Sequence, residues 1–91
     1  MERDIERYLV RRVKDIGGIA YKFVSPSNRG VADRLVVLPG GVVWFVEVKK
    51  PGGRMSTLQQ LFKRDVERLG HSHMVLWDKD DVDTFIKGVT A

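Results

Sequence analysis

The segment GGVVWFVEVKKPGG, residues 40–53, constrains the fold most, because it combines an apolar run with charges that a buried strand rarely carries. Val, Trp and Phe bounded by glycines predict a strand buried in a sheet. Alternation along this strand places Glu47 and Lys49 on one face, together with Val43 and Phe45. A buried charge costs free energy unless it is paired, hydrogen-bonded or bound to a metal, so these two charges require a specific reason.

A second apolar run, DRLVVLP, precedes this strand and is joined to it by Gly40 and Gly41. Two glycines suit the positive φ angles of a tight hairpin turn, so the two strands should pair antiparallel. Asp33 and Glu47 lie at nearly equal separations from this turn, and the pairing should bring them close to opposite one another. Two carboxylates and the Lys49 ammonium group should therefore converge at one end of the sheet.

Hydrophobic periodicity over 91 residues predicts a single domain, residues 1–91, with three helices and four strands. In chain order these are a helix over 2–16, strands over 19–24, 33–39 and 42–50, a helix over 56–70, a strand over 73–77 and a helix over 78–89. Ser56 and Gln59 form a capping-box signature at the start of the second helix. A hairpin followed by a helical crossover predicts an α/β fold with a mixed sheet flanked by helices.

Composition narrows the class of protein. The chain has no cysteine, which excludes disulfides, thiolate metal sites and cysteine nucleophiles. The apolar run at 42–46 is too short to span a bilayer, and the charged first turns are unlike a signal peptide, so we expect a cytoplasmic protein with no membrane partner. A net charge of +4 favours a polyanionic partner such as nucleic acid.

Convergent carboxylate oxygens are the ligands that Mg²⁺ prefers, together with water and phosphate oxygens. Asp33 and Glu47 are therefore candidate ligands for Mg²⁺ or Mn²⁺, and Lys49 adds a positive charge beside them. A metal that acidifies water and a cation that offsets charge developing on phosphorus suffice to hydrolyse a phosphodiester.

The same residues resemble a known superfamily. Asp33 followed by Glu47-Val48-Lys49 resembles the PD-(D/E)xK nucleases, and the longer pattern KFVSPSNRGVADRLVVLPGGVVWFVEVKKPGG with STLQQLF resembles their VRR-NUC branch over nearly the whole chain. The resemblance implies a restriction-endonuclease-like αβββαβ core with a mixed central sheet. One departure is Ala32, where the family usually has a proline that shapes the backbone.

The resemblance also implies roles for individual residues. Asp33 and Glu47 become metal ligands, the carbonyl of Val48 a further ligand, and Lys49 the group that acts on the attacking water. The family has an acid on the first helix and a glutamine on the second, which Gln59 matches. For the acid we prefer Glu2, which falls within the apolar stripe of its predicted helix, whereas Glu6 lies at the edge of that stripe.

Each candidate has a purely structural alternative. Glu47 and Lys49 fit the solvated end of a half-buried strand, and Asp33 fits a cap on the preceding turn. Gln59 fits a capping box as well as a catalytic support, and Glu2 fits an acid favoured by the helix dipole.

Five basic residues flank the carboxylates in sequence and should line a cleft for the DNA backbone: Lys22, Arg29, Arg34, Lys50 and Arg54. By contrast, Arg11, Arg12 and Lys14 are interpreted as an ordinary solvated helix face. His71 and His73 lack a third zinc ligand, so we expect surface or strand-edge positions and no catalytic role. Trp44 and Trp77 are expected in the core or in a dimer contact.

Together these features predict a metal-dependent, structure-specific DNA endonuclease. Stand-alone VRR-NUC proteins resemble Holliday-junction resolvases, and a homodimer would supply two active sites for a four-way junction while burying more surface. Two alternatives stay open at this point. One is a nuclease acting on flaps or nicked DNA within a phage replication or packaging complex, and the other is an inactive DNA-binding module on the same fold.

Overall fold

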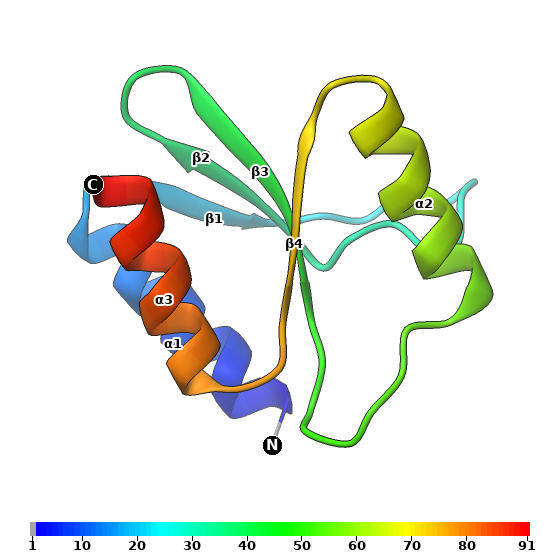
Figure 1. Cartoon of the computed structure of the whole chain (residues 1–91), viewed down its shortest axis with the longest axis horizontal. Coiled ribbons are helices and arrows are strands. Elements are labelled where there is room, and N and C mark those ends of the chain that lie inside the picture. The colour runs from blue at the N-terminus through cyan, green and yellow to red at the C-terminus, as the bar shows by residue number, and fades with distance from the viewer. Residues whose placement is uncertain (1) are drawn as a thin grey trace.

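A computed structural model describes residues 2–91 as a four-stranded mixed sheet between two layers of helices (Figure 1). The elements are α1 (Glu2–Asp15), β1 (Ile19–Lys22), β2 (Arg34–Leu38), β3 (Val42–Val48), α2 (Thr57–Arg68), β4 (Ser72–Leu76) and α3 (Lys79–Thr90). The strand order is β1-β2-β3-β4, with β4 parallel to β3 and the other pairs antiparallel. The predicted element order and the restriction-endonuclease-like α/β class are confirmed, with boundaries shifted by one or two residues.

The hairpin between β2 and β3 sets the register of the sheet. Gly40 and Gly41 have φ angles of 82° and 77°, which suit the tight turn predicted for them. Arg34 pairs with Val46 in the β2–β3 ladder. The next position outward therefore brings Asp33 opposite Glu47, as the sequence predicted.

Helix α1 and the sheet come into close contact through a glycine. The backbone N–H of Gly18 donates to the carbonyl of Val13 at 2.9 Å and ends the helix. A Cβ atom at Gly18 would lie 2.7 Å from the carbonyl oxygen of Val37, so only glycine allows the helix end to approach β2 this closely.

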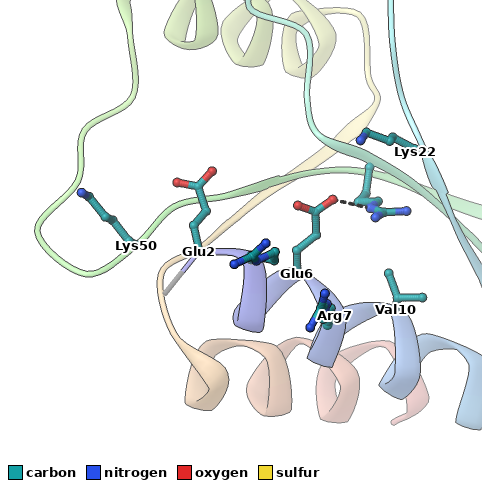
Figure 2. A pocket seen from close by; sticks show the side chains of 8 residues that line it. Glu2, Glu6, Arg7, Val10, Lys22 and Lys50 are labelled. Atoms are coloured by element: carbon teal, nitrogen blue, oxygen red, sulfur yellow. Dashed lines mark hydrogen bonds and ion pairs between the residues drawn. The ribbon is translucent and has the colours of Figure 1, made fainter.

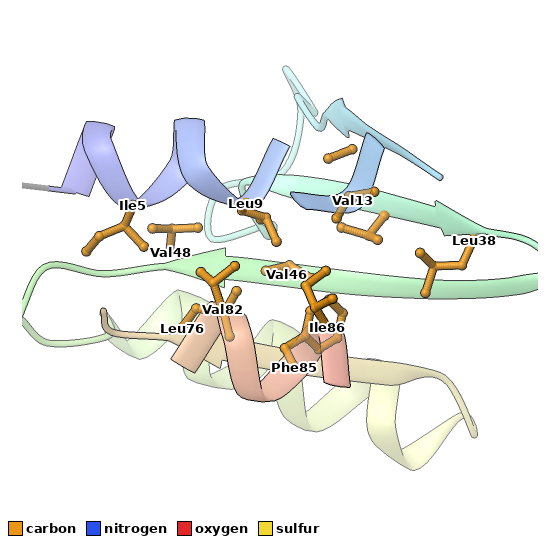
Figure 3. Close-up of a cluster of buried hydrophobic side chains, with 12 residues drawn as sticks. Ile5, Leu9, Val13, Leu38, Val46, Val48, Leu76, Val82, Phe85 and Ile86 are labelled. Atoms are coloured by element: carbon orange, nitrogen blue, oxygen red, sulfur yellow. The ribbon is translucent and has the colours of Figure 1, made fainter. Parts of the chain in front are cut away.

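The face of the sheet covered by α1 and α3 holds the hydrophobic core (Figure 3). Apolar residues at helical spacing in α1 and at alternate positions in the strands meet there. The buried cluster comprises Ile5, Leu9, Val13, Ala20, Val36, Leu38, Val46, Val48, Leu76, Val82, Phe85 and Ile86. Trp44 packs edge-on against Phe85 at 5.4 Å between ring centroids, so its predicted core position is confirmed.

The opposite face is covered only by α2, which packs against β4. Phe62 of α2 packs against Phe45 of β3, at 5.4 Å between ring centroids, and Phe23 joins this cluster. No residue of α2 is fully buried, and Leu58 stays 48% exposed. Along residues 2–91 we find no helix with the length and apolar character needed to cross a membrane.

Candidate active site

Asp33 is held between two strands at one end of the sheet. Its carboxylate Oδ2 accepts a hydrogen bond from the backbone N–H of Val48 at 2.8 Å. Its carbonyl accepts from the N–H of Phe23 at 2.9 Å, which ties it to the end of β1. The Asp33 side chain therefore points toward β3, where Glu47 is its neighbour.

Glu47 is the most unusual residue of the sheet, because its carboxylate is almost completely buried at 1% exposure. Its Oε2 accepts a hydrogen bond from Nε2 of Gln59 and lies 3.3 Å from Nζ of Lys49. Its Oε1 is buried and has no hydrogen-bond partner among the described residues. The alternative that Glu47 marks a solvated strand end is therefore wrong.

The pKa of Glu47 is raised to about 7, chiefly by burial and also by the nearby carboxylate of Asp33, while Lys49 opposes both effects. An unpartnered buried oxygen beside a second carboxylate is an environment that a cation would complete. The donor set of hard oxygens fits Mg²⁺ or Mn²⁺. Within residues 2–91 no three acidic or histidine side chains gather closely enough to hold a metal, so carbonyl, water or phosphate oxygens would complete its shell.

Gln59 makes the contacts that belong to both of its alternatives, a capping box at the start of α2 and a hydrogen bond to Glu47. Ser56 and Gln59 form a complete capping box, in which the Gln59 Oε1 accepts from the N–H of Ser56 at 2.8 Å. The other end of the same amide donates to Glu47. The start of α2 is therefore coupled to the carboxylate pair by one side chain.

The two candidate acids of α1, Glu2 and Glu6, differ in their surroundings (Figure 2). Glu6 accepts a hydrogen bond from Nε of Arg34 at 2.7 Å, and Arg34 also donates to the carbonyl of Ala20 at 3.1 Å. Glu2 is exposed, and both glutamates line a cavity beside α1. Glu6 thus belongs to a contact between α1 and the sheet, whereas Glu2 forms no ion pair within the described chain.

The predicted basic cleft forms only in part. Lys22, Arg34 and Lys50 line one cavity of about 700 Å³ together with residues of α1. Arg34 and Lys50 follow Asp33 and Lys49 in sequence, so the cavity lies at the same end of the sheet, but neither carboxylate of the pair lines it. Arg29 instead lines a separate cavity near Phe62, and Arg54 lines neither. The prediction of one cleft for all five is wrong for these two, because the loop carrying Arg29 packs against α2 rather than α1.

Arg3 and Arg7 also line that cavity. Neither was among the basic residues that the sequence predicted for the cleft. Their spacing of four residues, which places them on one side of the first helix, was the available signal.

The histidines of β4 lie where they were only partly expected. His71 is exposed, but His73 is buried at 6% exposure beneath α2, with its Nδ1 unpartnered within the described chain. Burial lowers the pKa of His73, and the charge of Lys63 lowers it further. The strand-edge alternative is confirmed, because both histidines lie at or beside the edge strand β4, whereas a surface position for His73 is wrong because α2 covers that face.

Comparisons with known proteins agree with this architecture. A protein of the Acyrthosiphon pisum secondary endosymbiont phage 1, described as "Putative nuclease p44", is 48% identical over 88 residues, which cover 97% of this chain and 94% of that protein. A solved structure described as a VRR_NUC domain superposes with a TM-score of 0.90 at 30% identity, over 94% of each chain. A search against family models found no match.

Both relatives match nearly the full chain, and the second shares its fold in detail. The resemblance to this family rests in part on four residues of the site: Asp33, Glu47, Lys49 and Gln59. This chain belongs to the VRR-NUC family of nucleases.

Proposed function

We propose that residues 1–91 form a single nuclease domain that hydrolyses DNA phosphodiesters with Mg²⁺ or Mn²⁺. One observation carries the proposal: Asp33 and Glu47 lie opposite each other, and Glu47 is buried with one oxygen unpartnered beside Lys49. Asp33 and Glu47 would hold the cation, with the carbonyl of Val48 as a third ligand and Glu2 as the acid of the first helix. When bound, the metal supplies a Lewis acid that polarises the phosphodiester and acidifies water.

The other residues of the site position groups and offset charge. The ammonium group of Lys49 can orient the attacking water and offset negative charge as it develops on phosphorus. Gln59 keeps Glu47 in place through its amide N–H. Water attacks phosphorus in line, the bond to the 3′ oxygen breaks, and that oxygen takes a proton, leaving 5′-phosphate and 3′-hydroxyl ends.

The basic residues would hold the phosphate backbone. Lys22 and Lys50 line the cavity of about 700 Å³ at this end of the sheet and form no ion pair within residues 2–91, so their charges are available to phosphate. Arg34 contributes less, because Glu6 already neutralises it. Arg29 and Arg54 would contact DNA farther from the cut. Backbone contacts of this kind favour recognition of DNA shape over sequence.

We propose a homodimer that acts on four-way junctions. The half of the sheet that α2 leaves bare supports this, because Ile19 and Tyr21 are each 52% exposed and Val43 is 43% exposed on that face. Exposed apolar side chains clustered on one face of a small domain suit contact with a second copy of the chain. A two-fold dimer would bring two sites to the two opposed strands of a junction. We propose the cytoplasm as the location, where such DNA is accessible.

Cleavage of an end-labelled immobile four-way junction tests the proposal, beside flap and linear duplex controls, with Mg²⁺ or Mn²⁺. Symmetric nicks that Lys49→Ala abolishes are the expected result. Cutting of flaps or nicked DNA alone would keep the chemistry and replace the resolvase by an enzyme of a phage replication or packaging complex. Binding without cutting under either metal would contradict the proposal and identify an inactive DNA-binding module.

A further inference from the structure

Helix α1 carries a stripe of positive charge that the catalytic proposal does not use. Arg3, Arg7, Arg11 and Lys14 follow one another at intervals of four, four and three residues, so they lie on one side of the helix. All four are exposed, and the stripe lies opposite the buried side that contains Leu9. None of the four forms an ion pair with an acidic side chain of residues 2–91.

This arrangement destabilises the free helix. Like charges three or four residues apart repel each other by a few tenths of a kcal/mol per pair. Arg3 also lies in the first turn, where the helix dipole disfavours positive charge. An anion placed along the stripe would remove both costs.

Four other cations of the helices differ from the stripe in having acidic partners. On α2, Lys63 pairs with Glu67 at 2.9 Å, and Arg64 and Arg68 both approach Asp65. On α1 itself, Arg12 is bound to Asp83 of α3. The stripe shares its lack of an acidic partner within residues 2–91 with Lys79 and Lys87 of α3, and Arg11 lies over the Tyr8 ring at 5.1 Å from its centroid. What distinguishes the stripe is that four such cations share one side of a single helix.

The stripe is continuous with the catalytic end of the molecule. Arg3 and Arg7 line the cavity that also contains Lys22 and Lys50, which Figure 2 shows across from α1. Arg7 also lines a second cavity of about 280 Å³ with Arg11 and Lys79, Asp4 being the acid of that lining. Arg7 therefore links the two cavities, and basic residues line both of them beside the acids Glu2, Asp4 and Glu6.

The length of the stripe matches a segment of DNA. Eleven residues of helix rise about 16 Å from Arg3 to Lys14. The axial rise per nucleotide of one DNA strand is about 3.4 Å, so the stripe runs beside about five phosphates. Flexible arginine and lysine side chains suit such sequence-independent contacts.

We propose that Arg3, Arg7, Arg11 and Lys14 form a second phosphate-binding surface, which holds a double-stranded DNA arm leaving the cleavage site. The proposal rests on the proposed nuclease function for the direction of the arm. It assigns α1 the task of selecting substrates that have a long duplex arm beside the cut, because a short arm cannot reach the far end of the stripe.

The test uses Arg7→Gln with Arg11→Gln in the Lys49→Ala background, where DNA is not cut. The matched control, Arg64→Gln with Arg68→Gln, removes the same charge from exposed positions of α2. Fluorescence anisotropy would measure the affinity for junctions with long and short arms over a range of salt concentrations. The stripe variant should bind the long-armed junction about tenfold more weakly or worse, and its slope of log affinity against log salt should fall by about 2.

The control should keep the affinity and the salt slope of the parent, and the loss in the stripe variant should be smaller for the short-armed junction. Because glutamine is a good helix former and removes repulsion, the stripe variant should melt at the same temperature or higher. Arg7→Glu provides a second variant, with a larger loss expected.

An unchanged salt slope in both stripe variants, beside normal junction cutting by the parent with Lys49 intact, would overturn the stripe and leave the nuclease standing. A reduced salt slope in the stripe variants, together with no junction cutting by the parent with Lys49 intact, would support the phosphate-binding stripe and contradict the proposed nuclease function. An equal loss in the control would also overturn the proposal, since net charge alone would then explain the binding. A stripe that binds single-stranded nucleic acid or an acidic protein better than duplex DNA would contradict the assigned partner.

Discussion

The two faces of the sheet differ in how completely they are covered. The face under α1 and α3 holds the apolar core, where Leu9, Val36 and Val46 are fully buried, and its charged pair of Arg34 and Glu6 lies at one end. The face under α2 contains the buried carboxylate of Glu47 and the buried imidazole of His73, each with an unpartnered polar atom in the described chain. On this face Ile19 and Tyr21 are exposed.

The comparison teaches where stability and chemistry reside in this small domain. The covered face provides the burial that holds the fold together. The other face places charges where they are costly without a ligand, and leaves apolar surface without a cover. On our proposals a metal, DNA and a second copy complete it, so substitutions on the two faces should have different consequences.

The largest effect is expected at the carboxylate pair. Asp33→Asn should lower cleavage by about a thousandfold, because one charged ligand is lost while the N–H of Val48 keeps an oxygen acceptor. Single-turnover cleavage measures the loss. Thermal stabilisation by Mn²⁺ should disappear with it, since a ligand stabilises only the state that binds it. Normal cleavage by this variant would show that Asp33 is not a metal ligand.

Next in size is a cavity in the covered face. Leu9→Ala should lower the free energy of unfolding by about 3 kcal/mol, because the fully buried side chain leaves a void. Leu61→Ala on α2, at 37% exposure, should cost less than about 1 kcal/mol. Urea unfolding of both variants compares the faces directly. Equal losses would show that the two faces contribute alike to stability.

The bare half of the second face should respond to a charge. Tyr21→Glu should weaken dimerisation by about a hundredfold, because a two-fold interface brings each introduced charge near its copy. Thr84→Glu on α3, across the sheet, serves as the matched control and should leave the dimer intact. Sedimentation at several concentrations distinguishes these outcomes. A monomeric parent would reject the dimer.

Buried Glu47 should make the metal-free protein less stable as the pH rises. Its pKa is raised from 4.5 to about 7, so between these values the folded state binds more protons than the unfolded state. Glu47→Gln should therefore match the parent near pH 4.5 and exceed its free energy of unfolding by about 3 kcal/mol at pH 8.

The measurement is chemical denaturation with a chelator across this pH range. Taking the difference between variant and parent cancels the opposite contribution of His73, whose lowered pKa reduces stability as the pH falls below 6.5. A difference that does not change with pH would show that Glu47 titrates normally.

The smallest expected effects distinguish Glu2 from Glu6, the two candidates for the site's acid on α1. Glu6→Gln should cost about 1 kcal/mol of stability through the lost ion pair with Arg34, and cleavage should fall less than threefold. Glu2→Gln should instead raise the Mg²⁺ concentration needed for half-maximal cleavage, with stability unchanged. The reverse pattern would make Glu6 the acid of the site.

Local patterns in the sequence predicted most of the fold. Alternation defined the strands, the glycine pair at 40–41 defined the hairpin, and the Ser56 and Gln59 signature defined the start of α2. Because a hairpin ties register to turn position, the same patterns also placed Asp33 opposite Glu47. These features depend on residues close together in the chain, which a sequence displays directly.

Only the tertiary structure decided which charges are buried and which are free. The contact of Gln59 with Glu47, the pairing of Arg34 with Glu6 and the burial of His73 beneath α2 all join separate elements. So does the gathering of Arg3 and Arg7 with Lys22 in one cavity. Such distances depend on how each helix packs across the sheet, and side chains that meet there carry no periodic mark of their partner in the sequence.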